Sequence, residues 1–240
     1  MADSLQSGST IMAGTGISPE KSDTKSITGQ ITKMPSFGII HKGYDVLPFY
    51  EDSSIFRFVS RDVPLNEKSY EPDDLVPINN EHINMAGRSG LKMRKEARDS
   101  LWIMAADFEK KFGVPLTVIS TYRSAAYQQW MWDLGKCTDS LCAPSGYSEH
   151  QLGLAMDVFD ATTERDYEAN QNYRRYIAWF KENAQRYGWT QSYQKGEAID
   201  TYEVEPWHWR YVGVDMATKL RNLGWTYTEY VRFQQIIARR

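Results

Sequence analysis

Two histidines, an aspartate and a glutamate in this 240-residue chain have the types and spacing that a metal-dependent hydrolase uses. His150 and Asp157 lie in SGYSEHQLGLAMDV (145–158), and Glu205 and His208 lie in VEPWHWRYV (204–212). Imidazole nitrogens and carboxylate oxygens are zinc ligands, and a catalytic zinc site leaves one position open for water. A further carboxylate beside that position could take a proton from the water. The elements around these residues must therefore bring four distant side chains together.

The segment between His150 and Asp157 has to turn back on itself if the two residues are to share an ion. In one helix, seven residues rise roughly 10.5 Å. In one strand they are about 23 Å apart and point to opposite faces. Gly153 is the residue that permits a reversal of the backbone. We therefore expect His150 on a loop and Asp157 within the strand LAMDVF (154–159), where a buried carboxylate needs a cation, a metal or several donors.

The second segment is predicted to be a strand that starts after Pro206. In such a strand His208 and Arg210 face one way, while the neighbouring aromatic residues face the other. Glu205 precedes the strand, so its carboxylate can lean over the same opening as His208 without competing to bind the ion. His150, Asp157 and His208 would then be three ligands, with Glu205 near the fourth position.

Each of these residues also has a simpler interpretation. A lone histidine in an apolar strand is more often a satisfied core residue than a ligand. Asp157 could pair with an arginine, Glu205 could pair with Arg210, and the Trp-His-Trp run could be core packing. Spacing alone does not decide between these interpretations and a metal site.

The motifs around these residues resemble those of the VanY-type D-alanyl-D-alanine carboxypeptidases, a group of zinc peptidases that act on bacterial cell-wall peptides. The resemblance extends over about residues 70–213 and includes the upstream TYRSAAYQ. Two motifs carry it, S-x-H-x-x-G-x-A-x-D and E-x-W-H, and they are met in full by Ser148, His150, Gly153, Ala155 and Asp157, and by Glu205, Trp207 and His208.

The resemblance implies a role for each site residue. It makes His150, Asp157 and His208 the ligands of one catalytic Zn²⁺, and Glu205 the catalytic base. Arg123, in the YRS motif, would stabilise the oxyanion that forms at the scissile carbonyl. Ser148 and Gln128 match positions near the substrate, although Ser148 could equally cap a helix or turn. A departure is Thr121, where the family often has Gly: a β-branched residue disfavours positive φ, so we expect a local change in the loop.

By the same resemblance, the chain is expected to be a zinc-dependent D,D-carboxypeptidase that removes the terminal D-Ala from D-Ala-D-Ala stem peptides of peptidoglycan or its precursors. One alternative is an endopeptidase or lysin of the same family, which cuts an internal bond such as L-Ala-D-Glu. A second is a catalytically silent zinc-binding domain. Glu205 argues against the silent domain, because a purely structural zinc has four protein ligands and no need of a base.

Hydrophobic periodicity predicts an α+β fold, a single domain with a small, mostly antiparallel sheet flanked by helices. EPDDLVPINN (71–80) is read as a loop. The expected strands span 54–60, 114–120, 154–159 and 207–213, and the expected helices span 90–112, 121–135, 173–187, 214–223 and 228–238.

Composition places limits on the class of protein. Apolar residues make up 41% of the chain and aromatic residues 13%, which is enough for a core. Residues 1–35 contain no aromatic residue and are interpreted as a flexible tail, with the zinc peptidase domain at 36–240. The formal net charge of −3 and the absence of a basic stripe argue against nucleic-acid binding. No apolar run is long enough for a transmembrane segment.

The cellular location is predicted from the substrate and from two cysteines. Cys137 and Cys142 have a spacing that suits a small disulfide loop, with two free thiols or half of a zinc site as alternatives. Half a zinc site is disfavoured, because the chain has no other cysteine. A disulfide and a peptidoglycan substrate both favour the cell envelope, outside the cytoplasm. The N-terminus has no signal-peptide pattern, so a cytoplasmic location or a removed export signal also fits.

Overall fold

A five-stranded mixed sheet lies at the centre of the fold, and two of its strands carry residues of the predicted metal site. The computed structural model describes residues 47–135, 141–161 and 163–238. The strand order is β2-β4-β5-β7-β6, with β2 parallel to β4 and every other pair antiparallel. The strands are β2 (Ile83–Asn84), β4 (Leu116–Ser120), β5 (Ala155–Val158), β6 (Trp189–Gln191) and β7 (His208–Tyr211). The α+β class and the mostly antiparallel sheet are confirmed.

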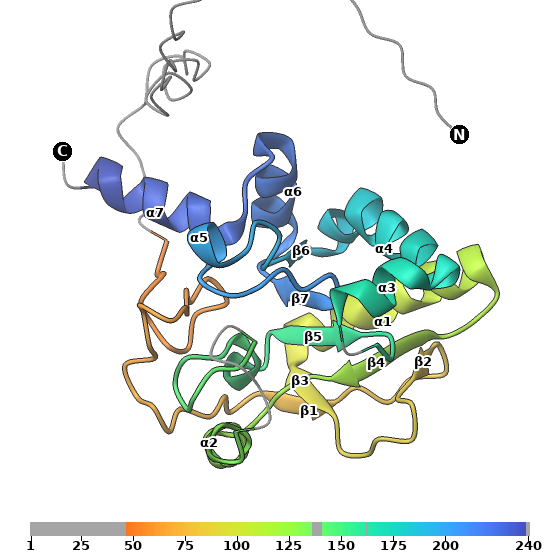
Figure 1. Cartoon of the computed structure of the whole chain (residues 1–240), viewed down its shortest axis with the longest axis horizontal. Helices are drawn as coiled ribbons and strands as arrows, with labels where there is room; N and C mark the ends of the chain where they lie inside the picture. The colour runs from red at the N-terminus through yellow and green to blue at the C-terminus, as the bar shows by residue number, and fades with distance from the viewer. Residues whose placement is uncertain (1–46, 136–140, 162, 239–240) are drawn as a thin grey trace, which may run out of the picture. The chain divides into compact units, whose positions relative to one another are not determined.

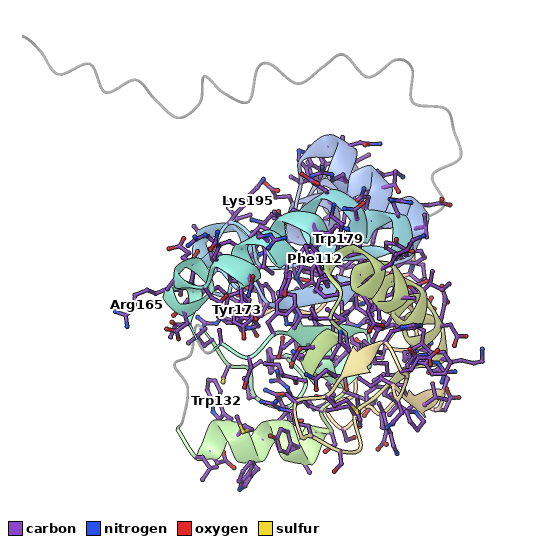
Figure 2. All side chains as sticks on the ribbon, turned by 90° about the vertical axis from the view of Figure 1, so that its right-hand side faces the viewer. Phe112, Trp132, Arg165, Tyr173, Trp179 and Lys195 are labelled. Atoms are coloured by element: carbon purple, nitrogen blue, oxygen red, sulfur yellow. The ribbon has the colours of Figure 1, made fainter. Side chains whose placement is uncertain are left out.

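The helices provide the other half of the core, and α1 and α4 lie to one side of the sheet (Figure 1). The seven α-helices of the described part are α1 (Lys95–Phe112), α2 (Ala125–Asp133), α3 (Glu164–Ala169), α4 (Gln171–Asn183), α5 (Glu197–Asp200), α6 (Val214–Leu223) and α7 (Tyr227–Ala238). Aromatic rings fill the space between α1 and α4, where Phe112 and Trp179 lie with centroids 6.4 Å apart (Figure 2). None of the described helices is long and apolar enough to cross a membrane.

Alternation along β5 and β7 separates the core from the candidate site. Met156, Val158 and Trp209 belong to the buried apolar cluster that also contains Phe108 of α1. Successive strand residues point to opposite faces, so Asp157, which lies between Met156 and Val158, points away from this cluster. The apolar face anchors the strands, and the opposite face is free to carry polar side chains.

The segment 54–60 is not the predicted strand. It is an irregular stretch with one isolated bridge, between Ser60 and Val63. The buried guanidinium of Arg57 donates to the backbone carbonyls of Phe49, Phe58 and Pro64 and so ties this stretch to the segments on either side of it. The backbone N–H groups of Arg57 and Phe58 bond to the nearby carbonyls of Ser54 and Phe49, so they are not paired with a neighbouring strand.

Other differences between sequence and structure concern short elements. The predicted loop 71–80 contains β1 (Leu75–Pro77), which pairs with β3 (Lys92–Arg94) in a separate two-stranded sheet. The helix predicted from 90 begins only at Lys95, after β3. The helix predicted over 173–187 changes to a 3-10 helix at Ala184–Tyr187. The predicted tail at residues 1–35, its boundary at 36, and Cys137 lie outside the described residues, so these stay predictions.

Candidate metal and catalytic site

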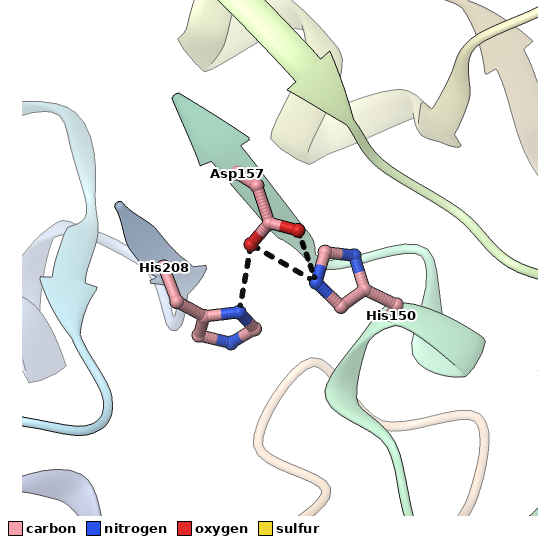
Figure 3. A group of neighbouring side chains, drawn as sticks. All are labelled: His150, Asp157 and His208. Atoms are coloured by element: carbon pink, nitrogen blue, oxygen red, sulfur yellow. Dashed lines mark hydrogen bonds and ion pairs between the residues drawn. The ribbon is translucent and has the colours of Figure 1, made fainter. Parts of the chain in front are cut away.

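Asp157 and His208 lie directly opposite each other on the adjacent antiparallel strands β5 and β7. Side chains in such a pair share one face of the sheet and are close neighbours. Oδ1 of Asp157 is 3.1 Å from Nδ1 of His208, and both residues are buried (Figure 3). Sheet register alone therefore places two of the three expected ligands together.

His150 reaches the same point from a loop, as the sequence predicts. It lies on the 3-10 helix η3 (Glu149–Leu152), which ends at Gly153 with φ of 65°. A Cβ atom at Gly153 would lie 2.8 Å from Cδ2 of Leu75, so the turn requires glycine for its conformation and for its space. Nε2 of His150 is 3.2 Å from the Asp157 carboxylate, which lies between the two imidazoles in Figure 3.

These three residues could hold a metal ion, because their ligand atoms all lie within 4.8 Å of one another. The partners of the imidazoles fit that function. Nδ1 of His150 lies 2.7 Å from the carbonyl of Thr121, and Nε2 of His208 lies 2.9 Å from Oε2 of Glu149. Donating a proton to these acceptors leaves Nε2 of His150 and Nδ1 of His208 as the ligand atoms. Metal-binding histidines are held in this way by carbonyl and carboxylate groups.

Burial and close contacts between the three side chains together set their pKa values. Burial disfavours the charged imidazole and lowers the pKa of His150 to about 4. Burial also disfavours the charged form of His208, but hydrogen bonds to Asp157 and Glu149 outweigh it and raise the pKa to about 10. Burial opposes ionisation of Asp157 too, yet the two imidazoles and Arg123 hold the pKa of its carboxyl well below the usual range. The cluster thus favours an ionised carboxylate.

Glu205 lies beside the candidate ligand atom of His208, with Oε2 3.7 Å from Nδ1. It is buried and lines a pocket that is also lined by His150, Asp157 and His208. Burial raises the pKa of Glu205 to about 8, and the positive charge of His208 acts against this rise. A carboxyl group with such a pKa can both take and return a proton near neutral pH.

Arg123 follows β4 and contacts the cluster directly. Its Nη2 donates to Oδ2 of Asp157 at 2.8 Å, and its Nε donates to Oγ of Ser120 at 3.0 Å. Among the described residues no partner is found for Nη1. Arg123 therefore fixes the carboxylate of Asp157 and keeps one nitrogen for another ligand. Thr121, two residues earlier, has no positive φ, so its β-branched side chain is accommodated without strain.

A pocket of about 580 Å³ contains all seven residues singled out from the sequence. Ser148 caps η3, since its Oγ accepts from the backbone N–H of His150 at 3.3 Å, and it also lines the pocket. Gln128 on α2 donates to the carbonyl of Ala143, and its Oε1 is buried with no hydrogen-bond partner in the described part of the chain. Gln128 also belongs to the lining of the pocket.

The sequence reasoning missed the residues that support His208. Glu149 is buried and accepts from His208 and also from Oγ of Ser192, at 2.6 Å. Tyr193 stacks on the His208 ring with centroids 4.6 Å apart. A signal existed for Glu149 alone: it is an acidic residue directly before a candidate ligand. Ser192 and Tyr193 lie just past β6, and nothing in the sequence indicates that β6 is next to β7.

Comparisons with known proteins agree with this geometry. The model of the VanY family, described as D-alanyl-D-alanine carboxypeptidase, matches residues 90–214. YodJ of Bacillus subtilis, whose name assigns it provisionally to the carboxypeptidases, is 36% identical over 172 residues. That alignment covers 68% of this chain and 62% of YodJ. A D-alanyl-D-alanine carboxypeptidase of Enterococcus faecalis is 37% identical over 94 residues, 39% of this chain and 33% of that protein. The chain thus spans less than two thirds of these relatives.

Solved structures with the same fold include two carboxypeptidase types. The LD-carboxypeptidase LdcB, solved in a study of peptidoglycan recognition, has a TM-score of 0.64 and 32% identity, covering 75% of this chain and 87% of that one. A variant of the vancomycin resistance D,D-pentapeptidase VanY in complex with Zn(II) has a TM-score of 0.54 and 26% identity, covering 72% and 97%. A complex of VanYB with D-alanine-D-alanine has a TM-score of 0.53 and 26% identity, covering 73% and 96%.

Proposed function

The chain belongs to the VanY family of D-alanyl-D-alanine carboxypeptidases, and we propose that it is a zinc-dependent D,D-carboxypeptidase acting on peptidoglycan stem peptides. The bond cleaved would be the one that joins the terminal D-Ala to the preceding D-Ala. A structural relative of known zinc content and another bound to D-alanine-D-alanine support this assignment.

His150, Asp157 and His208 would hold Zn²⁺ through Nε2, a carboxylate oxygen and Nδ1. When bound, the ion lowers the pKa of a water molecule and polarises a carbonyl group. Glu205 takes the proton of the attacking water and gives a proton to the leaving amine. Its place beside Nδ1 of His208 suits both transfers, because the carboxylate lies next to a ligand atom without being a ligand.

Arg123 would bind the oxygen of the scissile carbonyl through Nη1 as negative charge develops there. Preorganised donors of this kind supply a large share of the rate in hydrolytic enzymes. The hydrogen bond from Nη2 to Asp157 keeps the guanidinium at the edge of the metal cluster. Gln128 and Ser148, which line the pocket, would contact the peptide.

One observation carries the proposal: a buried carboxyl group, Glu205, lies 3.7 Å from the ligand atom of His208 in an open pocket. A catalytically silent zinc-binding domain has no use for a buried acid there, since burying a carboxyl group costs free energy. Peptidoglycan as substrate places the proposed activity in the cell envelope, outside the cytoplasm.

A second candidate is an L,D-carboxypeptidase, which removes the last D-Ala from a tetrapeptide stem. LdcB favours it, because its identity of 32% and TM-score of 0.64 exceed those of the two VanY structures. The two activities share a metal site and differ in the configuration of the residue before the cleaved bond.

Incubation with a pentapeptide stem and with a tetrapeptide stem, followed by mass spectrometry, separates these functions. A D,D-carboxypeptidase releases D-alanine from the pentapeptide and leaves the tetrapeptide intact. Release from the tetrapeptide alone identifies an L,D-carboxypeptidase, and cleavage between L-Ala and D-Glu identifies an endopeptidase. Intact peptides with stoichiometric zinc in a metal analysis would identify a silent binding domain.

A further inference from the structure

A second cavity, of about 560 Å³, adjoins the catalytic pocket. Cys142 and Tyr202 line both spaces, and Trp132 of α2 (Figure 2) lines the second one. Arg61 and Lys68 also line it, whereas no aspartate or glutamate of the described residues does. Because the whole chain carries a net charge of −3, a wall with two cations and no acid is a local positive site.

Both cations are held by aromatic rings and have spare hydrogen-bonding capacity. The Arg61 guanidinium carbon is 5.4 Å from the ring centroid of Tyr202, and Nζ of Lys68 is 5.4 Å from that of Tyr147. Nη1 of Arg61 is 3.8 Å from Glu197, a 56% exposed side chain that forms a weak pair. Among the described residues, Nη2 of Arg61 is shielded and has no hydrogen-bond partner, and none of the ion pairs involves Lys68. The two positive charges in a wall that contains no described acid favour an incoming anion.

A continuous column of side chains joins this cavity to the metal cluster. Tyr193 stacks on His208 at 4.6 Å, Tyr202 contacts Tyr193 with centroids 5.0 Å apart, and Arg61 lies over Tyr202. An extended peptide advances about 3.5 Å per residue. A few residues of a peptide bound at the metal cluster therefore reach Arg61.

The direction of the peptide follows from the reaction. In a carboxypeptidase substrate the terminal carboxylate is only three bonds from the scissile carbonyl carbon, so it stays in the pocket with the ligands. None of His150, Asp157 and His208 lines the second cavity. Only the longer, acyl side of the peptide extends that far. In a stem peptide this side carries the free α-carboxylate of D-glutamate, which is linked through its γ-carboxyl group, and in some stems the second carboxylate of diaminopimelate.

We propose that Arg61 and Lys68 form a subsite for a carboxylate on the acyl side of the cleaved bond. The inference rests on the proposed function and adds a determinant of substrate preference. The subsite requires no movement of the metal site, because the two cations would contact the peptide a few peptide residues away from the cleaved bond.

Three pentapeptides test the subsite and its source of carboxylate: one with D-glutamate and L-lysine, one with the α-carboxylate amidated, and one with diaminopimelate replacing lysine. A short diacetyl-L-Lys-D-Ala-D-Ala serves as the reference without the acyl-side carboxylate. For Arg61→Gln and Lys68→Gln we expect kcat/KM on the acidic peptide to fall about tenfold each, mainly through KM. The loss should be absent for the amidated and short substrates.

Arg165→Gln is the matched control, because Arg165 of α3 is exposed and extends away from the ribbon (Figure 2). If kcat/KM of the variants falls only for the peptide with diaminopimelate, the subsite is supported and its carboxylate comes from diaminopimelate instead of D-glutamate. Equal losses on all substrates, or no loss on any, would overturn it.

Binding of the tripeptide L-Ala-γ-D-Glu-L-Lys, measured by calorimetry, separates the two proposals. If the parent protein releases no D-alanine from any peptide, the proposed function fails, and the tripeptide still decides the subsite. About tenfold weaker binding to either variant supports it. Equal binding to parent and variants contradicts it.

Discussion

Asp157 and His208 are register partners in the central sheet, and their facing atoms Oδ1 and Nδ1 are 3.1 Å apart. The alternate residues Met156 and Trp209 are also paired, on the opposite face, where they belong to the apolar core. The register that buries the core therefore also sets the geometry of the ligands. A one-residue slip of either strand would turn its own candidate ligand to the core face and separate it from the other.

Glu149 is expected to tighten metal binding by holding His208. Removing a carboxylate that orients a metal-binding histidine typically weakens binding about 10- to 100-fold. We expect Glu149→Ala to be near the upper end, and Glu149→Gln near the lower end because the amide oxygen still accepts from Nε2. Zinc affinity measured by chelator competition checks this, with exposed Glu168→Gln as control. Equal affinity of Glu149→Ala and parent, at unchanged circular dichroism, would exclude this role.

Gly153→Ala should destabilise the fold more than Gly113→Ala. Both glycines have positive φ, 65° and 74°, but only Gly153 has atoms near the position of a Cβ. Gly113→Ala adds backbone strain alone, about 1 kcal/mol. Gly153→Ala adds a clash with Leu75 and should cost about 2–3 kcal/mol in total. Urea denaturation measures the difference, and equal free energies of unfolding would show that Leu75 moves aside freely.

Zinc affinity should rise with pH. In the metal-free protein the pKa of His208 is about 10, so a proton occupies Nδ1 at neutral pH and zinc must displace it. Each unit of pH between 6 and 8 should therefore tighten zinc binding about tenfold for one released proton. Calorimetry in buffers of different ionisation enthalpy counts that proton. An affinity that does not vary over this range would mean that His208 is neutral before zinc binds.

Arg123→Lys should impair turnover although it keeps the charge. Lysine cannot bind Asp157 and a substrate oxygen in one planar arrangement, and losing an oxyanion donor reduces kcat about 100-fold. Arg88 lines the same pocket but pairs with exposed Asp160 at 3.4 Å, so Arg88→Lys is the matched control. We expect at most about a twofold change there, since exposed ion pairs contribute little. A similar fall in kcat for both variants would contradict the assignment of Arg123 as the oxyanion donor.

The local chemistry of the site could be predicted from the sequence because it depends on short motifs. Gly153 was expected to reverse the chain, and it does so in a left-handed conformation after a 3-10 helix. Asp157 was expected in a buried strand, where β5 places it. The prediction that Glu205 leans over His208 agrees with the 3.7 Å contact.

What the sequence could not provide depends on contacts between distant segments. The pairing of Asp157 with His208 joins residues 51 positions apart, and no periodicity reports which strands are neighbours. The predicted strand at 54–60 is replaced by an irregular stretch whose Phe58 N–H bonds to the Phe49 carbonyl and whose Arg57 side chain donates to the flanking carbonyls of Phe49 and Pro64. Glu149 and Ser192 meet because β6 lies beside β7.

The most direct test of the central claim compares Glu205→Gln with the parent protein on a pentapeptide stem. Zinc content and D-alanine release are measured on the same samples. The amide keeps the shape of the side chain but cannot take a proton, so we predict stoichiometric zinc and a fall in kcat of at least about 100-fold. Release of D-alanine at the parent rate by the zinc-loaded variant would contradict the assignment of Glu205 as the base.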